Sequence, residues 1–416
     1  LGMVLMQTGK KIEALDANQK AVALSPKDAE AFNNLGNAQK ELGRLQGAEG
    51  SYKKVIALKP GFAGGHYNLG VTLKQMGRIK EAADSYKNAI ALKPDFFQAH
   101  NNLGNALKEQ GKLNEACAAY FHAISLDPNS IEVYFNISQT IKDIRFSSEN
   151  PQACQIMMKL LTIENLIRPK NIARSILSLL EQNPLIKGLL HIENNASSFT
   201  KTISTIKALN KANLLHDLMR LCPLPDLRFE RLFVSIRRVL LINLEKVKTS
   251  PELVYFLSTL SLHCFTNEYI YCEKEEETDL VDRLETEIAQ AVAKSEQPAA
   301  IKILCFSTYR PLHRYDWCKK LNNLDHLEEV KRRLITEPLA EKAIAKEMAN
   351  LGKVLDEVSY KVSKQYEEHP YPRWIKLGIP KNGKSISDIC NEANLHLYSE
   401  DIKNIAVPAI LIAGCD

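Results

Sequence analysis

The feature that most constrains the fold is an internal repeat of 34 residues near the N-terminus. Two glycines and one proline recur at this spacing through successive units. The three sets are Gly2, Gly36, Gly70 and Gly104; Gly9, Gly43, Gly77 and Gly111; and Pro26, Pro60, Pro94 and Pro128. A fixed period of this size is typical of a solenoid, in which each unit buries its apolar face only against its neighbours.

Each unit contains two stretches with apolar residues at helical spacing. In residues 31–62 the two stripes are Ala31, Leu35, Ala38 and Leu42, and then Ala48, Tyr52, Val55 and Ile56. Gly43 can end the first helix and Pro60 stops the second. The pattern predicts stacked helical hairpins. With Leu-Gly early, Ala and Tyr in the middle and Pro at the end, it resembles the tetratricopeptide repeat.

We predict a repeat domain over residues 1–145. Residues 1–130 hold four units, the first of them truncated. Residues 131–145 begin a fifth, in which Ile137 and Ser138 replace the Leu-Gly pair. The sequence FSSENPQ at 146–152 then interrupts the second helix, so a capping helix or a new packing unit should begin there.

Two polar residue types also recur every 34 residues, and they predict a binding face. They are Asn34, Asn68, Asn102 and Asn136, and Lys40, Lys74, Lys108 and Lys142. In a superhelix, equivalent positions form ladders along one face. An asparagine ladder can both donate to and accept from an extended peptide backbone. This ladder resembles the asparagine-lined inner face of protein O-linked N-acetylglucosamine transferases.

The expected partner is therefore a protein or an extended peptide on the concave face of the array. The lysine ladder would favour acidic side chains or a carboxylate terminus. The alternative is that the asparagines cap and pack between repeats while the lysines form a solvated face.

Charge and cysteine usage narrow the class of protein. The net charge is +5 and the basic residues are spread along the chain, so composition gives no reason to expect nucleic acid. The nine cysteines include no CxxC pair, which fits reduced thiols in a cytoplasmic protein. A zinc site from Cys305, His313 and Cys318 is conceivable, but bystander cysteines fit this spacing better and we expect no metal. The longest uncharged run, 253–267, is too short for a membrane span.

Residues 146–336 predict a helical middle domain without a short repeat. Apolar residues lie at helical spacing in 171–182, 227–247, 252–265 and 278–294. The acidic run 273–279 is interpreted as a solvated helix start. His263, His313 and His369 have no partner at ligand or triad spacing, so we expect them in the core or on the surface.

The next segment, 337–404, contains an unusual motif. Residues 365–374 read Gln-Tyr-Glu-Glu-His-Pro-Tyr-Pro-Arg-Trp. This stretch resembles the lead-in of bacterial proteins that join tetratricopeptide repeats to an S-adenosylmethionine-dependent methyltransferase, in which Asn stands in place of His369. The resemblance covers most of 220–416. The two X-Pro steps predict an extended segment, in which Tyr371, Arg373 and Trp374 could contact a substrate or clamp two domains together.

The last residues, VPAILIAGCD at 407–416, have the pattern of a buried parallel strand that opens onto a glycine. The resemblance makes 405–416 the first strand of an α/β, Rossmann-like methyltransferase domain. It also implies that Ala413, Gly414 and Cys415 approach S-adenosylmethionine in the complete protein. Asp416 stands where that family has glycine.

Both ends of the chain fall inside predicted elements, so we expect a fragment of a longer protein. The catalytic residues would lie beyond its end. We expect this fragment to bind no cofactor and to methylate nothing.

A rival reading comes from Gly378–Ser385. Its sequence, GIPKNGKS, matches the phosphate-loop pattern G-x-x-x-x-G-K-S, with Lys384 as the phosphate-binding lysine. The preceding RWIKL is short and charged rather than a buried strand. Pro380 removes an amide from a loop that needs free amides. Nucleotide binding is therefore the weaker hypothesis.

These observations together predict a mainly α protein. A tetratricopeptide solenoid is followed by a helical middle domain and by the start of an α/β methyltransferase domain. The predicted function is selection of a protein partner by the array on behalf of a putative methyltransferase. The alternative is a non-catalytic peptide-binding scaffold or adaptor. The sequence does not decide whether the protein is an enzyme.

Overall fold

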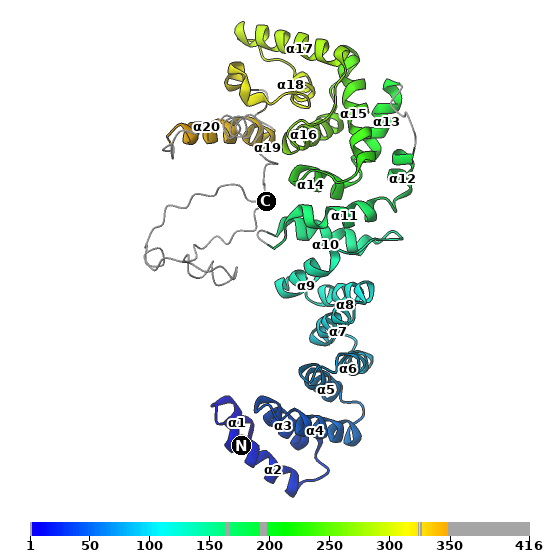
Figure 1. Cartoon of the computed structure of the whole chain (residues 1–416), viewed down its shortest axis with the longest axis vertical. Coiled ribbons are helices and arrows are strands. Elements are labelled where there is room, and N and C mark those ends of the chain that lie inside the picture. The colour runs from blue at the N-terminus through cyan, green and yellow to red at the C-terminus, as the bar shows by residue number, and fades with distance from the viewer. Residues whose placement is uncertain (1, 164–165, 192–197, 323, 325–326, 348–416) are drawn as a thin grey trace, which may run out of the picture.

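A computed structural model of the chain describes residues 2–163, 166–191, 198–322, 324 and 327–347. All of the regular elements in these residues are helices. Figure 1 shows a narrow array of helical hairpins that leads into a wider helical region. The predicted repeat solenoid and helical middle region are confirmed.

The repeat array is built from helices in pairs. Its helices are α1 (Gly2–Gln7), α2 (Lys11–Leu24), α3 (Ala29–Glu41), α4 (Leu45–Leu58), α5 (Ala63–Gln75), α6 (Ile79–Leu92), α7 (Phe97–Glu109), α8 (Leu113–Leu126) and α9 (Ile131–Ile141). The first helix of each complete pair ends two residues before a glycine with positive φ: +71° at Gly43, +75° at Gly77 and +76° at Gly111. Glycine adopts this left-handed conformation without a steric penalty, which explains its recurrence at the turn.

A second recurring glycine lets the two helices of a pair approach closely. A Cβ added at Gly36 would lie 2.8 Å from the ring of Tyr52, and one at Gly104 would lie 2.4 Å from the ring of Tyr120. These tyrosine rings are fully buried. The small residue and the large residue of the repeat are therefore two halves of one contact.

The first helices of successive pairs form the inner layer of the array. Helix α3 packs against α5, α5 against α7, and α7 against α9, whereas the second helices α2, α4, α6 and α8 approach one another less closely. The layer whose helices lie closer together is the shorter one. The array therefore curves with its first helices on the inside, which is the face where the asparagine ladder was predicted.

The pairing changes after α9, as the sequence predicted. Each hairpin of the array has a short turn, but α9 ends at Ile141 and α10 begins only at Pro151. The apolar core nevertheless continues without a break, because residues from Ala48 to Ile335 belong to one buried cluster. The array and the helical region thus share their packing.

The helical region has prolines at helix starts, where a missing N–H costs nothing. Its α-helices are α10 (Pro151–Thr162), α11 (Pro169–Leu180), α12 (Pro184–His191), α13 (Phe199–Leu209), α14 (Asn213–Leu221), α15 (Leu227–Ile242), α16 (Pro251–Thr266), α17 (Glu275–Ala293), α18 (Ala300–Ser307), α19 (Glu328–Lys331) and α20 (Glu337–Glu347). Short 3-10 turns follow α15 and α18, and one π-helical turn, Arg332–Thr336, joins α19 to α20.

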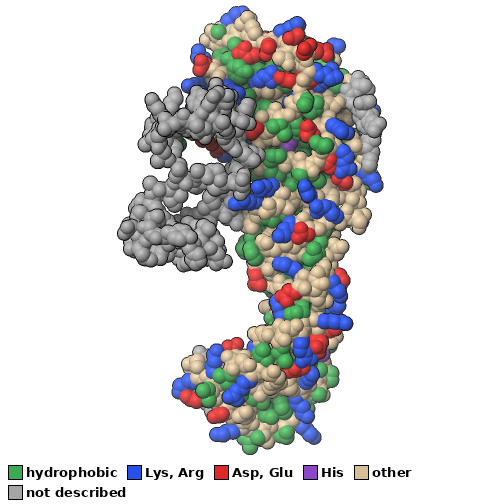
Figure 2. All heavy atoms as spheres, in the orientation of Figure 1, with side chains coloured by type: hydrophobic (Ala, Val, Ile, Leu, Met, Phe, Trp, Pro, Cys, Tyr) green, Lys and Arg blue, Asp and Glu red, His purple; other side chains and the backbone are tan. Residues whose placement is uncertain are grey.

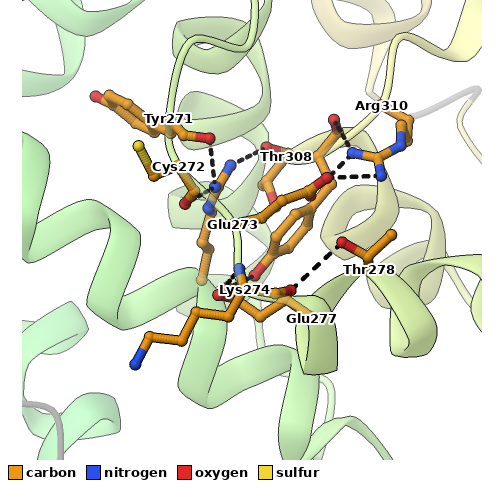
Figure 3. A network of polar contacts seen from close by, with 10 residues as sticks. Tyr271, Cys272, Glu273, Lys274, Glu277, Thr278, Thr308 and Arg310 are labelled. Atoms are coloured by element: carbon orange, nitrogen blue, oxygen red, sulfur yellow. Dashed lines mark hydrogen bonds and ion pairs between the residues drawn. The ribbon is translucent and has the colours of Figure 1, made fainter.

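A buried cation of α15 joins the segment before α17 to the residue after α18, and Figure 3 labels its acceptor residues Tyr271, Cys272 and Thr308. Arg237 is 1% exposed and donates to the main-chain oxygens of Thr308, Tyr271 and Cys272 at 3.0, 3.1 and 2.9 Å. Its guanidinium also lies 4.2 Å from the centroid of the Tyr309 ring. Because a desolvated charge is costly, this set of acceptors and the aromatic face is what makes the burial possible.

The acidic run predicted as a solvated helix start does begin α17, but one of its residues is buried. Glu277 is 1% exposed, where it accepts from Lys274 N at 3.0 Å and from the Tyr309 hydroxyl at 2.9 Å. The prediction was wrong for this residue, because a run of acidic residues does not show which carboxylate will find buried hydrogen-bond donors. Glu273 remains nearer the surface and pairs with Arg310 at 2.8 Å.

The expectation for His263 is confirmed. This residue is 1% exposed, and its Nδ1–H donates to the Met219 carbonyl oxygen at 3.1 Å. Its Nε2 therefore accepts from the Tyr271 hydroxyl at 2.8 Å. Burial lowers the pKa of His263 to about 4, so the imidazole is neutral at neutral pH.

Several predictions fall outside the described residues. These are the strand at 405–416 with Ala413, Gly414 and Cys415, the motif with Tyr371, Arg373 and Trp374, and the phosphate-loop match Gly378–Ser385. Helix α20 covers the beginning of the predicted lead-in segment. Among the helices that the structure describes, none is both long and apolar enough to cross a membrane.

Candidate functional site

The asparagine ladder lies on the first helices of four successive repeats. Asn34, Asn68, Asn102 and Asn136 belong to α3, α5, α7 and α9, and all four are half-buried. They occupy the same position in each helix because the repeat is strictly 34 residues long. The array therefore brings together residues that are far apart in the chain.

The ladder asparagines make a regular bond between repeats. In each case the acceptor lies in the preceding repeat. Asn68 Nδ2 donates to Asn33 Oδ1 at 3.0 Å, Asn102 Nδ2 to the Tyr67 hydroxyl at 3.2 Å, and Asn136 Nδ2 to Asn101 Oδ1 at 3.0 Å. Each acceptor is 35 residues before its donor. Asn34 has a different role, because its main-chain oxygen accepts from Asn18 Nδ2 at 3.1 Å.

These bonds define a second row on the inner face, which we call the acceptor row: Asn33, Tyr67, Asn101 and Phe135. Its first three members each accept from a ladder asparagine. This row was not predicted from the sequence, although it follows the same period one residue before the ladder. Its residue types vary, which hides the period from a search for identical residues.

Asn68, Asn102 and Asn136 keep bonding capacity after the bond to the preceding repeat. A primary amide has two N–H donors and a carbonyl acceptor, and the bond between repeats uses one donor. None of the four ladder side chains is among the buried polar atoms that lack a partner in the described structure. Of the two alternatives set by the sequence, packing between repeats is seen for Asn68, Asn102 and Asn136, and peptide binding stays a prediction.

At a third position of the first helices, asparagine side chains accept hydrogen bonds from the buried tyrosines. Asn37 Oδ1 accepts from the Tyr52 hydroxyl at 2.7 Å, and Asn105 Oδ1 accepts from the Tyr120 hydroxyl at 2.7 Å. In the repeat between them this position is Val71. The Tyr86 hydroxyl of that repeat is buried and has no hydrogen-bond partner among the described residues.

The lysine ladder is less uniform than the asparagine ladder. Lys74 lies 3.2 Å from Glu109. In the described part of the chain, Lys40 and Lys108 are half-buried and form no ion pair, and Lys142 is exposed just after the end of α9. The charge of Lys74 is thus paired with that of Glu109, whereas the other three lysines remain available to an acidic ligand.

The cysteines and histidines do not form a metal site in the described residues. No group of three or more His, Cys, Asp or Glu side chains there could hold an ion. Cys305 is fully buried, and burial raises its pKa to about 12, so it is a protonated core thiol. The seven cysteines that the structure describes are all free, as the sequence predicted.

The helical region contains a separate cavity of about 570 Å³ at the start of α16. Its wall includes Pro251, Val254 and Leu262, and Arg220 lies with its guanidinium 5.3 Å from the Tyr255 ring centroid. Arg220 also faces Glu329 at 3.8 Å. The cavity is mainly apolar and its one cation already has an aromatic and an acidic neighbour.

Comparison with known families identifies the N-terminal units. A model described as TPR repeat matches residues 2–43, 72–111 and 104–140, and one described as tetratricopeptide repeat matches residues 29–62. The chain therefore carries a tetratricopeptide repeat array. It matches none of the curated proteins with which it was compared.

Among solved structures the chain is similar to other repeat proteins. A crystal structure of MamA is 21% identical and covers 44% of this chain and 96% of its own, with a TM-score of 0.34. The first TPR of Spaghetti (RPAP3), bound to the HSP90 peptide SRMEEVD, is 22% identical and covers 27% and 89%, with a TM-score of 0.27. The TPR domain of Arabidopsis OM64 is 22% identical and covers 28% and 96%, with a TM-score of 0.27.

Proposed function

We propose that the array binds an extended segment of a protein partner along its inner face. The observation that carries this proposal is the asparagine ladder: Asn68, Asn102 and Asn136 are each held by one bond to the preceding repeat, and each amide has a further N–H donor and a carbonyl acceptor. An extended backbone presents one donor and one acceptor per residue, which is the complement of this row. A side chain that is already held in place loses little entropy when it binds.

The test is a matched pair of double variants. Asn68→Ala with Asn102→Ala removes two ladder amides, and Asn88→Ala with Asn114→Ala removes two exposed asparagines from the second helices α6 and α8. The ladder pair should weaken binding of a partner peptide by about 10- to 30-fold, because each lost hydrogen bond is worth about 1 kcal/mol. The second-helix pair should leave the affinity unchanged. Equal affinities for both pairs, at unchanged helicity, would refute the proposal.

The lysines at the ladder's edge give this segment its expected charge. Lys40 and Lys108 form no ion pair in the described structure, so acidic side chains in the partner would find cations at both positions. Binding should accordingly weaken as salt rises, because exposed charges are screened within about 8 Å at physiological ionic strength. Salt-independent binding would remove the lysines from this role.

A second candidate function rests on the sequence of 337–416 alone. Here we propose that the array selects a partner for an S-adenosylmethionine-dependent methyltransferase, as the motif at 365–374 and the run at 407–415 suggest. The residues implied for the cofactor lie outside the described structure, and Asp416 replaces a glycine of that family's turn. Calorimetric titration of the natural full-length protein with S-adenosylmethionine tests the idea, and absence of binding would refute it.

A further inference from the structure

The inner face ends at α9 with an exposed aromatic residue. Phe135 occupies the acceptor row after Asn33, Tyr67 and Asn101, and its side chain is 51% exposed. The other members of the row are polar or carry a hydroxyl that accepts from the next repeat. Phe135 has no polar atom to offer. It therefore leaves an apolar surface where the polar row stops.

A second apolar side chain extends this surface. Ile131 lies four residues before Phe135, so the two share one side of α9, and it is 57% exposed. Gln139 and Lys142 continue the same side toward the end of the helix, because positions i, i+4 and i+7 or i+8 align. Glu132 is not free to cover the patch, because its Oε1 accepts from Asn101 Nδ2 at 2.8 Å.

Exposed cations surround the end of α9. The Ser175 hydroxyl of α11 donates to Ile141 O at 2.6 Å and lies 3.1 Å from Lys142 O, which fixes α11 against this helix end. Arg145 lies beside it, with Nη1 3.4 Å from Ser175 Oγ, and Arg174 precedes Ser175 in the chain.

Lys142, Arg145 and Arg174 are all exposed, and in the described structure they form no ion pair. Asp143 is the exposed acid among them. Figure 2 shows Lys and Arg side chains gathered over α10 and α11, at the same level of the molecule. Lys142 is the last position of the lysine ladder, and Arg145 is linked to it through Ser175, the residue after Arg174.

We infer that the end of α9 is an anchor site for a partner segment with one large apolar residue next to acidic residues. This inference rests on the proposed function, since the ladder would hold the backbone that leads to the anchor. The apolar residue covers Phe135 and Ile131, and the carboxylates meet Lys142, Arg145 and Arg174. The inner face is continuous with this site, because α7 packs directly on α9. An apolar partner without acids would leave these three cations unpaired.

The test uses a display library of random twelve-residue peptides, selected on the intact chain. Enriched peptides should share an apolar residue followed or preceded by Asp or Glu. The Phe135→Ala variant should bind a selected peptide about tenfold or more weakly, as truncation of an aromatic anchor does. Leu227→Ala, which removes an apolar side chain that is 66% exposed on α15, should bind it unchanged.

A second set of variants tests the contribution of the cations. Lys142→Glu with Arg174→Glu should weaken the same peptide about tenfold, mostly at low salt, and Lys248→Glu should not. Replacing the acids of the peptide with amides should have the effect of the double variant. Enriched peptides without the apolar and acidic pattern, or unchanged affinity for Phe135→Ala, would overturn the anchor site.

The two proposals fail in different ways. If Asn68→Ala with Asn102→Ala weakens the selected peptide while Phe135→Ala does not, the groove stands and the anchor site is wrong. If Phe135→Ala matters and the ladder variant does not, the apolar site acts alone and the proposed role of the ladder is wrong. If the library yields no enriched peptide, both are overturned.

Discussion

The three buried tyrosines of the array offer an internally controlled test of what a single hydrogen bond contributes. Tyr52 and Tyr120 each donate to an asparagine at 2.7 Å, whereas the Tyr86 hydroxyl is buried and has no partner among the described residues; in its repeat Val71 stands at the position of the asparagine. Burial raises the pKa of all three tyrosines well above the usual range, so each hydroxyl is protonated and carries a hydrogen that needs an acceptor. The three rings sit in equivalent positions, each against a glycine of the first helix.

The expected effects of Tyr→Phe differ in sign. At Tyr52 and Tyr120 the change should destabilise the repeat by about 1 kcal/mol, the net worth of a typical hydrogen bond. At Tyr86 it removes a buried polar group with no partner, whose burial costs about 1–3 kcal/mol, partly offset by lost contacts of the oxygen. Tyr86→Phe should therefore be neutral or stabilising by up to about 1 kcal/mol.

Val71→Asn turns this contrast into a double-mutant cycle. It places in the third repeat the amide that Asn37 supplies in the second. The single change also loses apolar contact of the valine, so its own sign is not the informative quantity. The coupling between Val71→Asn and Tyr86→Phe isolates the new bond and should be about 1 kcal/mol.

Hydrogen exchange followed by mass spectrometry is the appropriate assay, because a solenoid opens locally and need not unfold as one unit. Amides of α5 and α6 report on the third repeat. A change of about 1 kcal/mol alters their exchange rate about fivefold. If Tyr86→Phe lowers protection as much as Tyr52→Phe, and the cycle shows no coupling, then the Tyr86 hydroxyl has a partner and the reasoning is wrong.

Three further predictions concern packing and burial. Gly104→Ala should cost about 1–3 kcal/mol, because its Cβ would lie 2.4 Å from the ring of Tyr120, while Gly50→Ala on an open helix face should gain up to about 1 kcal/mol; urea unfolding followed by circular dichroism separates them. The folded pKa of His263, about 4, lies below its unfolded value of about 6.5, so its contribution to the free energy of unfolding is complete above about pH 6.5 and is lost as the pH falls toward 4. His263→Phe should therefore reduce the slope of stability against pH in this range. An equal slope in both proteins would contradict this prediction. Arg237→Met should cost about 3–5 kcal/mol by leaving three main-chain oxygens without a donor, which a melting temperature within 2 °C or so of the parent would disprove.

The period made the repeat array predictable because it encodes geometry directly. A residue that recurs every 34 positions must meet the same neighbours in each unit, so the roles of Gly36, Gly43 and Tyr52 followed from one unit and held in the others. The break after α9 was also predictable. FSSENPQ offers neither the glycine turn nor the apolar stripe that a second helix needs at that position.

The acceptor row and the buried charges could not be predicted in the same way. Asn33, Tyr67 and Asn101 share a function without sharing a residue type, since an amide oxygen and a phenol oxygen both accept from the ladder. Arg237 lies in the helical stretch 227–247, where only the apolar spacing was used in the prediction. Its burial depends on carbonyl groups 34 to 71 residues away, and no local pattern reports such partners.

The central claim is that the first helices form the binding face. The most direct measurement is a hydrogen-exchange footprint of the chain with and without a peptide selected from the display library. We expect the bound peptide to add protection in α3, α5, α7 and α9 and to leave α4, α6 and α8 unchanged. Protection confined to the second helices, or to the helical region from α10 onward, would contradict it.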